Sequence, residues 1–286
     1  MKATGRVMAE MDDGSFRPVP IEDLAVPIED LAVPTEPPPE PPPVAGVFFD
    51  GFRDLSIEDG QAPTRGRRYV DSFAAWGVRR LANAPNLDQG VKRFVEGVTH
   101  AVGADGLHLM ARPTVDERTG YVAGMISTER SFSMTYGDVD LCMKVPSLGP
   151  GLHLSSWLMP ADGGGLPEYD QLELIGSNRF APNGPINAVF MNAKNDFGGH
   201  WRQFDVRPGW LNDFHDYRFS WRKSGLTWFI DGQEVHQAPN LYDEPMYWML
   251  TWEVGASSNK DFPGPIMPGT PWPAVAVVKS VKLTPA

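Results

Sequence analysis

Short segments in which apolar and polar residues alternate run from Val47 to the end of the chain, with turn signals between them. The clearest are residues 107–112, 137–145, 217–222, 226–230 and 275–283. Side chains alternate between the two faces of a strand, so this pattern predicts half-buried β-strands. No segment shows the period of a three-turn helix, and the best candidate, residues 89–98, is broken by glycines. The chain is therefore predicted to fold as an all-β sandwich or barrel.

The first 45 residues have a different composition. The heptapeptide Pro-Ile-Glu-Asp-Leu-Ala-Val occurs twice in tandem, at 20–26 and 27–33, and a proline in every repeat excludes a continuous helix. Residues 34–43 then contain seven prolines and two glutamates, which is typical of a semi-rigid polyproline spacer. We expect residues 1–45 to be a disordered tail and residues 46–286 to form one domain.

Charge and cysteine content narrow the choice of partners. The formal net charge of −11 argues against nucleic acid, since nucleic-acid binding needs a basic surface, and it favours a neutral glycan over a polyanion. The single cysteine, Cys142, excludes an intramolecular disulfide. No apolar run has the length of a membrane helix, and the N-terminal segment lacks the apolar stretch of a secretory signal. We expect a monomer that does not insert into membranes.

One predicted strand carries three acids, Glu168, Asp170 and Glu173, among apolar residues. Glu168 and Asp170 share a face by their even spacing, but Glu173 would point the other way on a regular strand. One extra residue, a β-bulge at Gln171-Leu172, would bring all three carboxyl groups onto one face. Crowded carboxyl groups cannot all ionise, so one stays protonated near neutral pH while another is charged. Glycosidic bond cleavage needs a protonated acid beside an ionised carboxylate. The alternative is that the three acids only line a solvent-exposed edge strand and have no catalytic role.

An ordered set of motifs resembles glycoside hydrolase family 16, the group of laminarinases, lichenases and succinoglycan depolymerases. Residues 124–133 and 135–140 look like the strand pair that enters the cleft, and 144–146 and 157–160 like the approach to the catalytic strand. Residues 168–173 fit the bulged E-x-D-x-x-E variant, and 214–221 and 228–235 match the pair of segments downstream. The resemblance implies a curved antiparallel jelly roll of the concanavalin A-like type, with a glycan cleft on its concave face.

Carried over by position, Glu168 would be the nucleophile and Glu173 the general acid/base of a retaining mechanism. Asp170, between them, would tune the pair. The resemblance implies an endo-β-glycanase that hydrolyses a β-1,3- or β-1,3/1,4-linked polysaccharide, with a bacterial exopolysaccharide as one candidate substrate. The resemblance implies that this activity requires no cofactor. Family members often carry a structural calcium ion, but nothing in the sequence locates one. The six histidines show no zinc spacing.

Five further residues are candidate sugar ligands. Trp157 belongs to the matching motif, and its ring either stacks on a sugar or fills the core between the sheets. Along residues 247–254, alternation separates an all-apolar set beginning at Trp248 from a second set that should face the cleft. This second set contributes Tyr247, Thr251 and Glu253. The fifth candidate is His153.

Several positions depart from the family pattern. Cys142 stands where an arginine is usual, and residues 153–157 replace a Trp-Pro-Ala-Phe-Trp segment. Phe190 aligns with a common cleft histidine, and an asparagine is common near Thr251. These changes predict a shifted substrate preference or weak activity.

Two alternatives stay open. A non-catalytic glycan-binding module could use the same fold, because a fold does not fix a function. Transglycosylation would use the same residues, with a sugar acceptor in place of water. The substrate class implies an extracellular or cell-surface location. The sequence shows no signal peptide, so it does not indicate how the protein would be exported.

Overall fold

The computed structural model describes the backbone in several ranges. These are residues 8–10, 16–18, 46–53, 57–58, 69–70, 91–92, 96–115, 120–129, 131–163, 165–177, 186–255 and 264–286.

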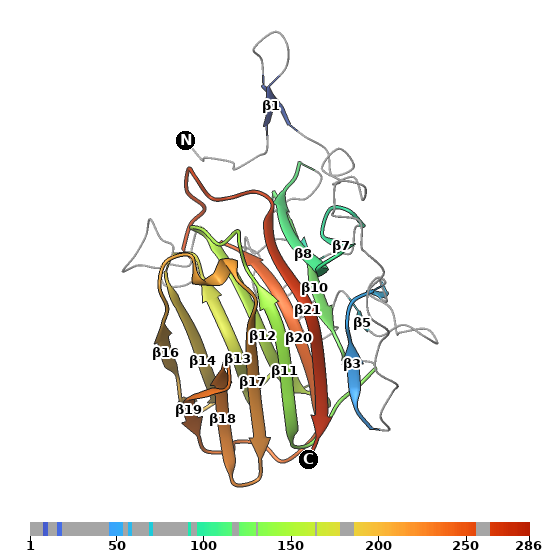
Figure 1. Cartoon of the computed structure of the whole chain (residues 1–286), viewed down its shortest axis with the longest axis vertical. Coiled ribbons are helices and arrows are strands. Elements are labelled where there is room, and N and C mark those ends of the chain that lie inside the picture. Colours follow the sequence, from blue (N-terminus) through green and yellow to red (C-terminus); the bar gives the residue numbers. More distant parts are fainter. Residues whose placement is uncertain are drawn as a thin grey trace.

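Within these ranges, two large sheets form the domain (Figure 1), and we call them sheet I and sheet II. Sheet I has nine strands in the order β15-β14-β13-β12-β20-β10-β5-β4, with β16 also paired to β14. Its strands are β4 (Ile57–Glu58), β5 (Tyr69–Val70), β10 (Met125–Ser127), β12 (Leu152–Pro160), β13 (Glu168–Ile175), β14 (Ala188–Asn195), β15 (Gly198–Gly199), β16 (Arg202–Asp205) and β20 (Met246–Val254).

Sheet II has ten strands in the order β19-β18-β17-β11-β21-β8-β9-β6, with β3 also paired to β21 and β7 to β8. Its strands are β3 (Phe48–Asp50), β6 (Val91–Lys92), β7 (His100–Gly103), β8 (Gly106–Pro113), β9 (Tyr121–Ala123), β11 (Gly137–Lys144), β17 (His215–Arg222), β18 (Gly225–Ile230), β19 (Gln233–Ala238) and β21 (Ala274–Pro285). Nearly all pairs are antiparallel; β4–β5 and β6–β9 are parallel.

The two sheets pack face to face, and Figure 1 shows strands of sheet II lying over those of sheet I. The only helical element in the described ranges is the 3₁₀ turn Trp210–Asn212. The prediction of an antiparallel β-sandwich is therefore confirmed. The five strands predicted most clearly from alternation correspond to β8, β11, β17, β18 and β21.

The core lies between the sheets because alternate residues of each strand point inward. Buried and partly buried residues alternate strictly along β11. Sheet II contributes Trp221 and Trp228 to the core and sheet I contributes Trp248 and Trp252, and all four side chains are buried. Burying a large apolar side chain stabilises the fold by about 1.5–3 kcal/mol, so these four residues join the sheets strongly.

One expectation about the strands was wrong. Residues 124–133 and 135–140 do not form a strand pair, because β10 belongs to sheet I and β11 to sheet II. β10 pairs with β20, while β11 pairs with β17 and β21. The chain crosses from one sheet to the other between them, so the pair expected from the family resemblance does not form.

The N-terminal segment contains one described feature. β1 (Met8–Glu10) and β2 (Phe16–Pro18) form an antiparallel pair. The repeats and the proline-rich stretch lie outside the described residues, so the disordered tail and the boundary at residue 46 stay predictions. Among the helices of the described residues, none is long and apolar enough to cross a membrane.

Candidate functional site

The three acids of β13 share one face of sheet I. The register against β12 skips Gln171, because Ser156 lies opposite Leu172 and the next residue lies opposite Asp170. On β14, Asp170 pairs with Asn192 two positions from the partner of Glu173. This is the predicted bulge, and it turns all three carboxyl groups away from the core. We call this side of sheet I, turned away from sheet II, the acid face.

The bulge is held from inside the sandwich. The Gln171 amide lies in the core, where Nε2 donates to the carbonyls of Val139 and Tyr217 at 3.0 Å each. Its Oε1 accepts from Ser156 Oγ at 2.7 Å. Moving Gln171 out of this position would break three buried hydrogen bonds, which costs free energy. Gln171 therefore holds β13 against the backbone of sheet II.

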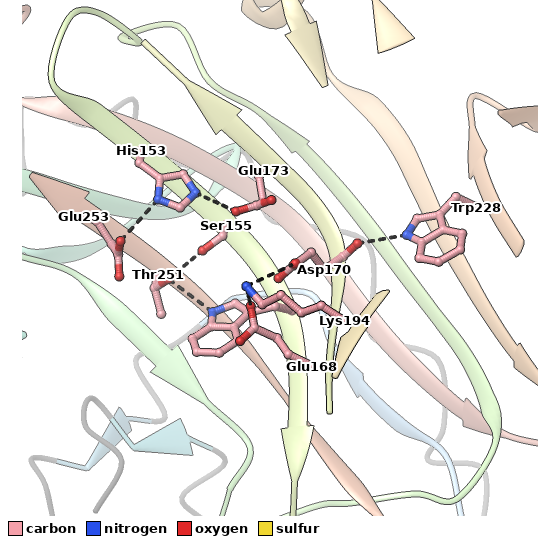
Figure 2. A network of polar contacts seen from close by, with 10 residues as sticks. His153, Ser155, Glu168, Asp170, Glu173, Lys194, Trp228, Thr251 and Glu253 are labelled. Carbon is pink, nitrogen blue, oxygen red and sulfur yellow. Dashed lines mark hydrogen bonds and ion pairs between the residues drawn. The ribbon is translucent and has the colours of Figure 1, made fainter. Parts of the chain in front are cut away.

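A second contact from sheet II reaches the same place. Trp228 Nε1 donates to the backbone carbonyl of Asp170 at 2.9 Å (Figure 2). A bulge interrupts the regular ladder, and the indole supplies a partner for a buried carbonyl that would otherwise cost free energy.

The first two acids contact a lysine, Lys194, that no sequence motif marks. Lys194 Nζ lies 2.5 Å from Glu168 Oε1 and 3.9 Å from Asp170 Oδ2. Burial lowers the pKa of Lys194, but the negative charges of Asp170 and Glu168 raise it above its usual value. The ammonium therefore stays charged and stabilises a negative charge on Glu168.

Asp170 is the most buried acid of the trio, and its surroundings favour its protonated form. It is almost fully buried, and burial together with the charges of Glu168 and Glu173 raises its pKa well above the usual value. A protonated Asp170 can donate to Glu168. From the resemblance we expected the reverse direction, with Asp170 accepting from Glu168 and helping to keep Glu173 protonated; that role of Asp170 in tuning the pair stays a prediction.

The third acid contacts a histidine. His153 Nε2 lies 3.3 Å from Glu173 Oε1, and its Nδ1 lies 3.2 Å from Glu253 Oε2. Figure 2 shows the imidazole between the two carboxyl groups. Burial lowers the pKa of His153, but hydrogen bonds and charge from Glu173 and Glu253 outweigh burial and raise it to about 9. His153 is therefore an imidazolium at neutral pH.

The other predicted ligands lie on the same face, but they are buried. Trp157 is not in the core between the sheets; it packs with Tyr247 and three methionines in a separate apolar cluster. Its Nε1 donates to Thr251 Oγ1 at 3.3 Å, and that hydroxyl also bonds Ser155 Oγ at 3.0 Å. The predicted alternation along β20 is confirmed, since Trp248 is in the core and Tyr247 is in this cluster.

The departure at Cys142 does not affect the acid face. Cys142 lies on β11 of sheet II, where it lines a groove of about 490 Å³ together with Asp140, Arg218 and Phe229. The missing arginine therefore does not remove a ligand beside the acids. Phe190, by contrast, pairs with Glu173 on the acid face, where we expected a changed ligand.

Sequence reasoning missed Lys194 and Asn192, because both lie on β14 and no motif marks that strand. The register supplies the signal: Lys194 lies opposite Glu168 and Asn192 opposite Asp170. Asn192 Oδ1 is buried and has no hydrogen-bond partner among the described residues. Within the same residues no group of three or more metal-ligating side chains is found, and the expectation about calcium stays a prediction.

Comparison with known proteins identifies the family. The model for glycosyl hydrolases family 16 matches residues 94–258, more than half of the chain. The chain belongs to glycosyl hydrolases family 16. The matched range contains β13 with its three acids and both strands that pair with it, β12 and β14.

Two relatives within family 16 are similar over most of this chain. "Glucan endo-1,3-beta-glucosidase A1" of Niallia circulans is 24% identical over 253 residues, which is 77% of this chain and 35% of the relative. "Endo-1,3-1,4-beta-glycanase EglC" of Rhizobium meliloti is 28% identical over 228 residues, 73% of this chain and 46% of the relative. The chain thus spans less than half the length of either.

A solved family 16 structure, the β-glucanase of Bacillus licheniformis, is similar with a TM-score of 0.60 and 19% identity. The likeness covers 85% of this chain and 99% of that one. It shows the jelly-roll fold, as expected from the sequence.

Proposed function

We propose that this chain is an endo-acting, retaining β-glycanase that hydrolyses a β-1,3- or β-1,3/1,4-linked polysaccharide. One observation carries the proposal: the bulge places Glu168, Asp170 and Glu173 on one face, with Asp170 buried and the two glutamates partly exposed. The relatives named above, one named as a glucan endo-1,3-β-glucosidase and the other as an endo-1,3-1,4-β-glycanase, support the substrate class.

In the first step, the Glu168 carboxylate attacks the anomeric carbon while Glu173 donates its proton to the leaving glycosidic oxygen. Lys194 and protonated Asp170 hold Glu168 in place, since Lys194 of β14 contacts its carboxylate and Asp170 shares a hydrogen bond with it. Glu173 becomes a carboxylate in this step, and the His153 imidazolium at 3.3 Å stabilises the new charge.

In the second step, the Glu173 carboxylate accepts a proton from water, and the water oxygen attacks the anomeric carbon of the glycosyl-enzyme. The bond to Glu168 breaks, and Glu168 leaves as a carboxylate. Two inversions at the anomeric carbon give a product with the same configuration as the substrate. A sugar hydroxyl in place of this water would give transglycosylation.

The test is reducing-end release from a β-1,3-glucan, a mixed-linkage β-1,3/1,4-glucan and a bacterial exopolysaccharide. We expect Glu168→Gln to lower release about a thousandfold or more, because no nucleophile remains. Glu234→Gln, an exposed residue of β19 remote from the acids in sheet order, is the matched control and should match the wild type.

Proton NMR of the first product formed should show retained β-configuration. An inverted product would contradict the role of Glu168 as nucleophile. Binding of glucan without release by the wild type would identify a glycan-binding module instead.

A further inference from the structure

Large apolar side chains are exposed at one corner of sheet I. In the described part of the chain they are Leu166, at 37% relative exposure, Phe197, at 97%, and Trp201, at 67%. Leu166 lies two residues before Glu168, and Glu168 pairs with Lys194 near the end of β14. Phe197 and Trp201 flank the short β15 strand that follows. All three therefore lie beside the Glu168 end of the acid face.

The register indicates the face on which Trp201 lies. Gln203 pairs with Phe190, which in turn pairs with Glu173, so these three residues share the acid face. Side chains alternate along an extended chain, which places Trp201 on the same face as Gln203. Arg202 pairs with Met191, so Trp201 lies next to Asn192. The acid face thus continues outward from Asp170 through Asn192 to Trp201.

The hairpin that carries these aromatic residues is fixed by hydrogen bonds. The Phe197 N–H donates to Asn195 Oδ1 at 2.9 Å, and the His200 N–H donates to the carbonyl of Ala193 at 2.9 Å. His236 of β19 donates from Nε2 to the carbonyl of His200 at 3.0 Å. Gly198 has φ +143, which a residue with a side chain rarely adopts. The rings are therefore presented to solvent on a fixed support.

We propose that Trp201 and Phe197 form an outer platform that binds a segment of the polysaccharide beyond the sugars held at the acids. This proposal rests on the proposed function and specifies which chains the site prefers. Indole and phenyl faces stack on the C–H faces of pyranose rings, which explains exposed aromatic residues next to a polar site.

The platform predicts a preference for long chains. Trp201→Ala should raise KM for a polymeric β-glucan about fivefold to tenfold, as expected for losing contact with one aromatic ring, and leave kcat nearly unchanged. The same variant should leave kcat/KM unchanged on an oligosaccharide too short to reach the platform. Phe197→Ala should act in the same direction, and Trp201→Tyr should restore most of the polymer KM.

Phe229→Ala is the matched control, since Phe229 is an aromatic residue in the groove of sheet II. It should leave both substrates unaffected. Equal KM values for wild type and Trp201→Ala on the polymer would overturn the platform. So would a Trp201→Ala effect of the same size on polymer and oligosaccharide, because that result would indicate a disturbed active centre.

Binding in a Glu168→Gln background separates this proposal from the proposed function. Affinity electrophoresis in gels that contain β-glucan should show weaker retardation for Glu168→Gln/Trp201→Ala than for Glu168→Gln. If the wild type releases no reducing ends but Trp201→Ala still weakens retardation, the hydrolase proposal fails and the platform stands. If Trp201→Ala changes only the sedimentation coefficient and leaves retardation unchanged, the patch is an interface between copies and the platform is overturned.

Discussion

At the scale of single residues, the acid face depends on how positive and negative charges are paired. Lys194 contacts Glu168 and Asp170, and His153 contacts Glu173 and Glu253. Each cation therefore contacts acids at one end of β13. A buried carboxylate cluster without these cations would carry a large electrostatic penalty, so the charges stabilise the fold and the proposed chemistry together.

The charge on His153 predicts a pH-dependent stability. The folded protein raises the pKa of His153 from 6.5 to about 9, so the folded state holds its proton more tightly than the unfolded chain. The contacts of the imidazolium with Glu173 and Glu253 therefore contribute fully below pH 6.5, and their contribution is lost as pH rises through 9. We expect the loss to be on the order of 3 kcal/mol.

Urea unfolding of wild type and His153→Gln between pH 6 and pH 10 measures this contribution. The difference in unfolding free energy between the two proteins should shrink across that range. A difference that stays constant with pH would mean that His153 is not charged in the folded protein.

At the scale of elements, the bulge in β13 decides where the acids point. Gln171 is its extra residue, and its amide is buried among partners from sheet II. Replacing this side chain with an apolar one leaves two buried carbonyls without their donor, at a cost of about 1–3 kcal/mol. It also removes the contact that keeps Glu173 in phase with Glu168.

Gln171→Leu should therefore lower the unfolding free energy. It should also lower kcat by more than the fraction of unfolded protein in the assay accounts for. Urea unfolding and initial rates on the preferred glucan provide the two measurements. Gln237→Leu, at an exposed position of β19, is the control and should change neither. A Gln171→Leu protein with full activity would show that the bulge does not need this side chain.

The sequence predicted the bulge because three acids at odd spacing on an apolar strand require one extra residue to share a face. It predicted the two faces of β20, since alternation is a local property. It did not predict Lys194 beside Glu168, or Gln171 reaching the carbonyls of sheet II, because these contacts depend on which distant strands become neighbours. The error over β10 and β11 is of the same kind, because motifs matched along the chain locate strands but do not assign them to sheets.

At the scale of the whole molecule, the strand nearest the C-terminal end of the sequence, β21, lies in the middle of sheet II. It pairs with β11 and β8, and β3 also pairs with it. Its inward residues, among them Val278 and Val281, are buried in the core. Sheet II therefore consists of two parts that only β21 joins within the described pairings.

Removing residues 274–286 should abolish cooperative unfolding rather than lower its midpoint slightly, because both neighbours of β21 would lose their backbone partners. Circular dichroism during a thermal ramp checks this, and removal of residue 286 alone is the control. A truncated protein with a sharp transition near that of the wild type would contradict the central role of β21.

The place of β21 also determines when the molecule can take shape as it is made. A ribosome delivers residues in order, so β8 and β11 leave the exit tunnel more than a hundred residues before the strand that must lie between them. Sheet II cannot close until residues 274–285 have emerged, and sheet I waits similarly for β20. Folding of this domain thus waits for its last strand, and until then its unpaired strand edges need protection from other chains.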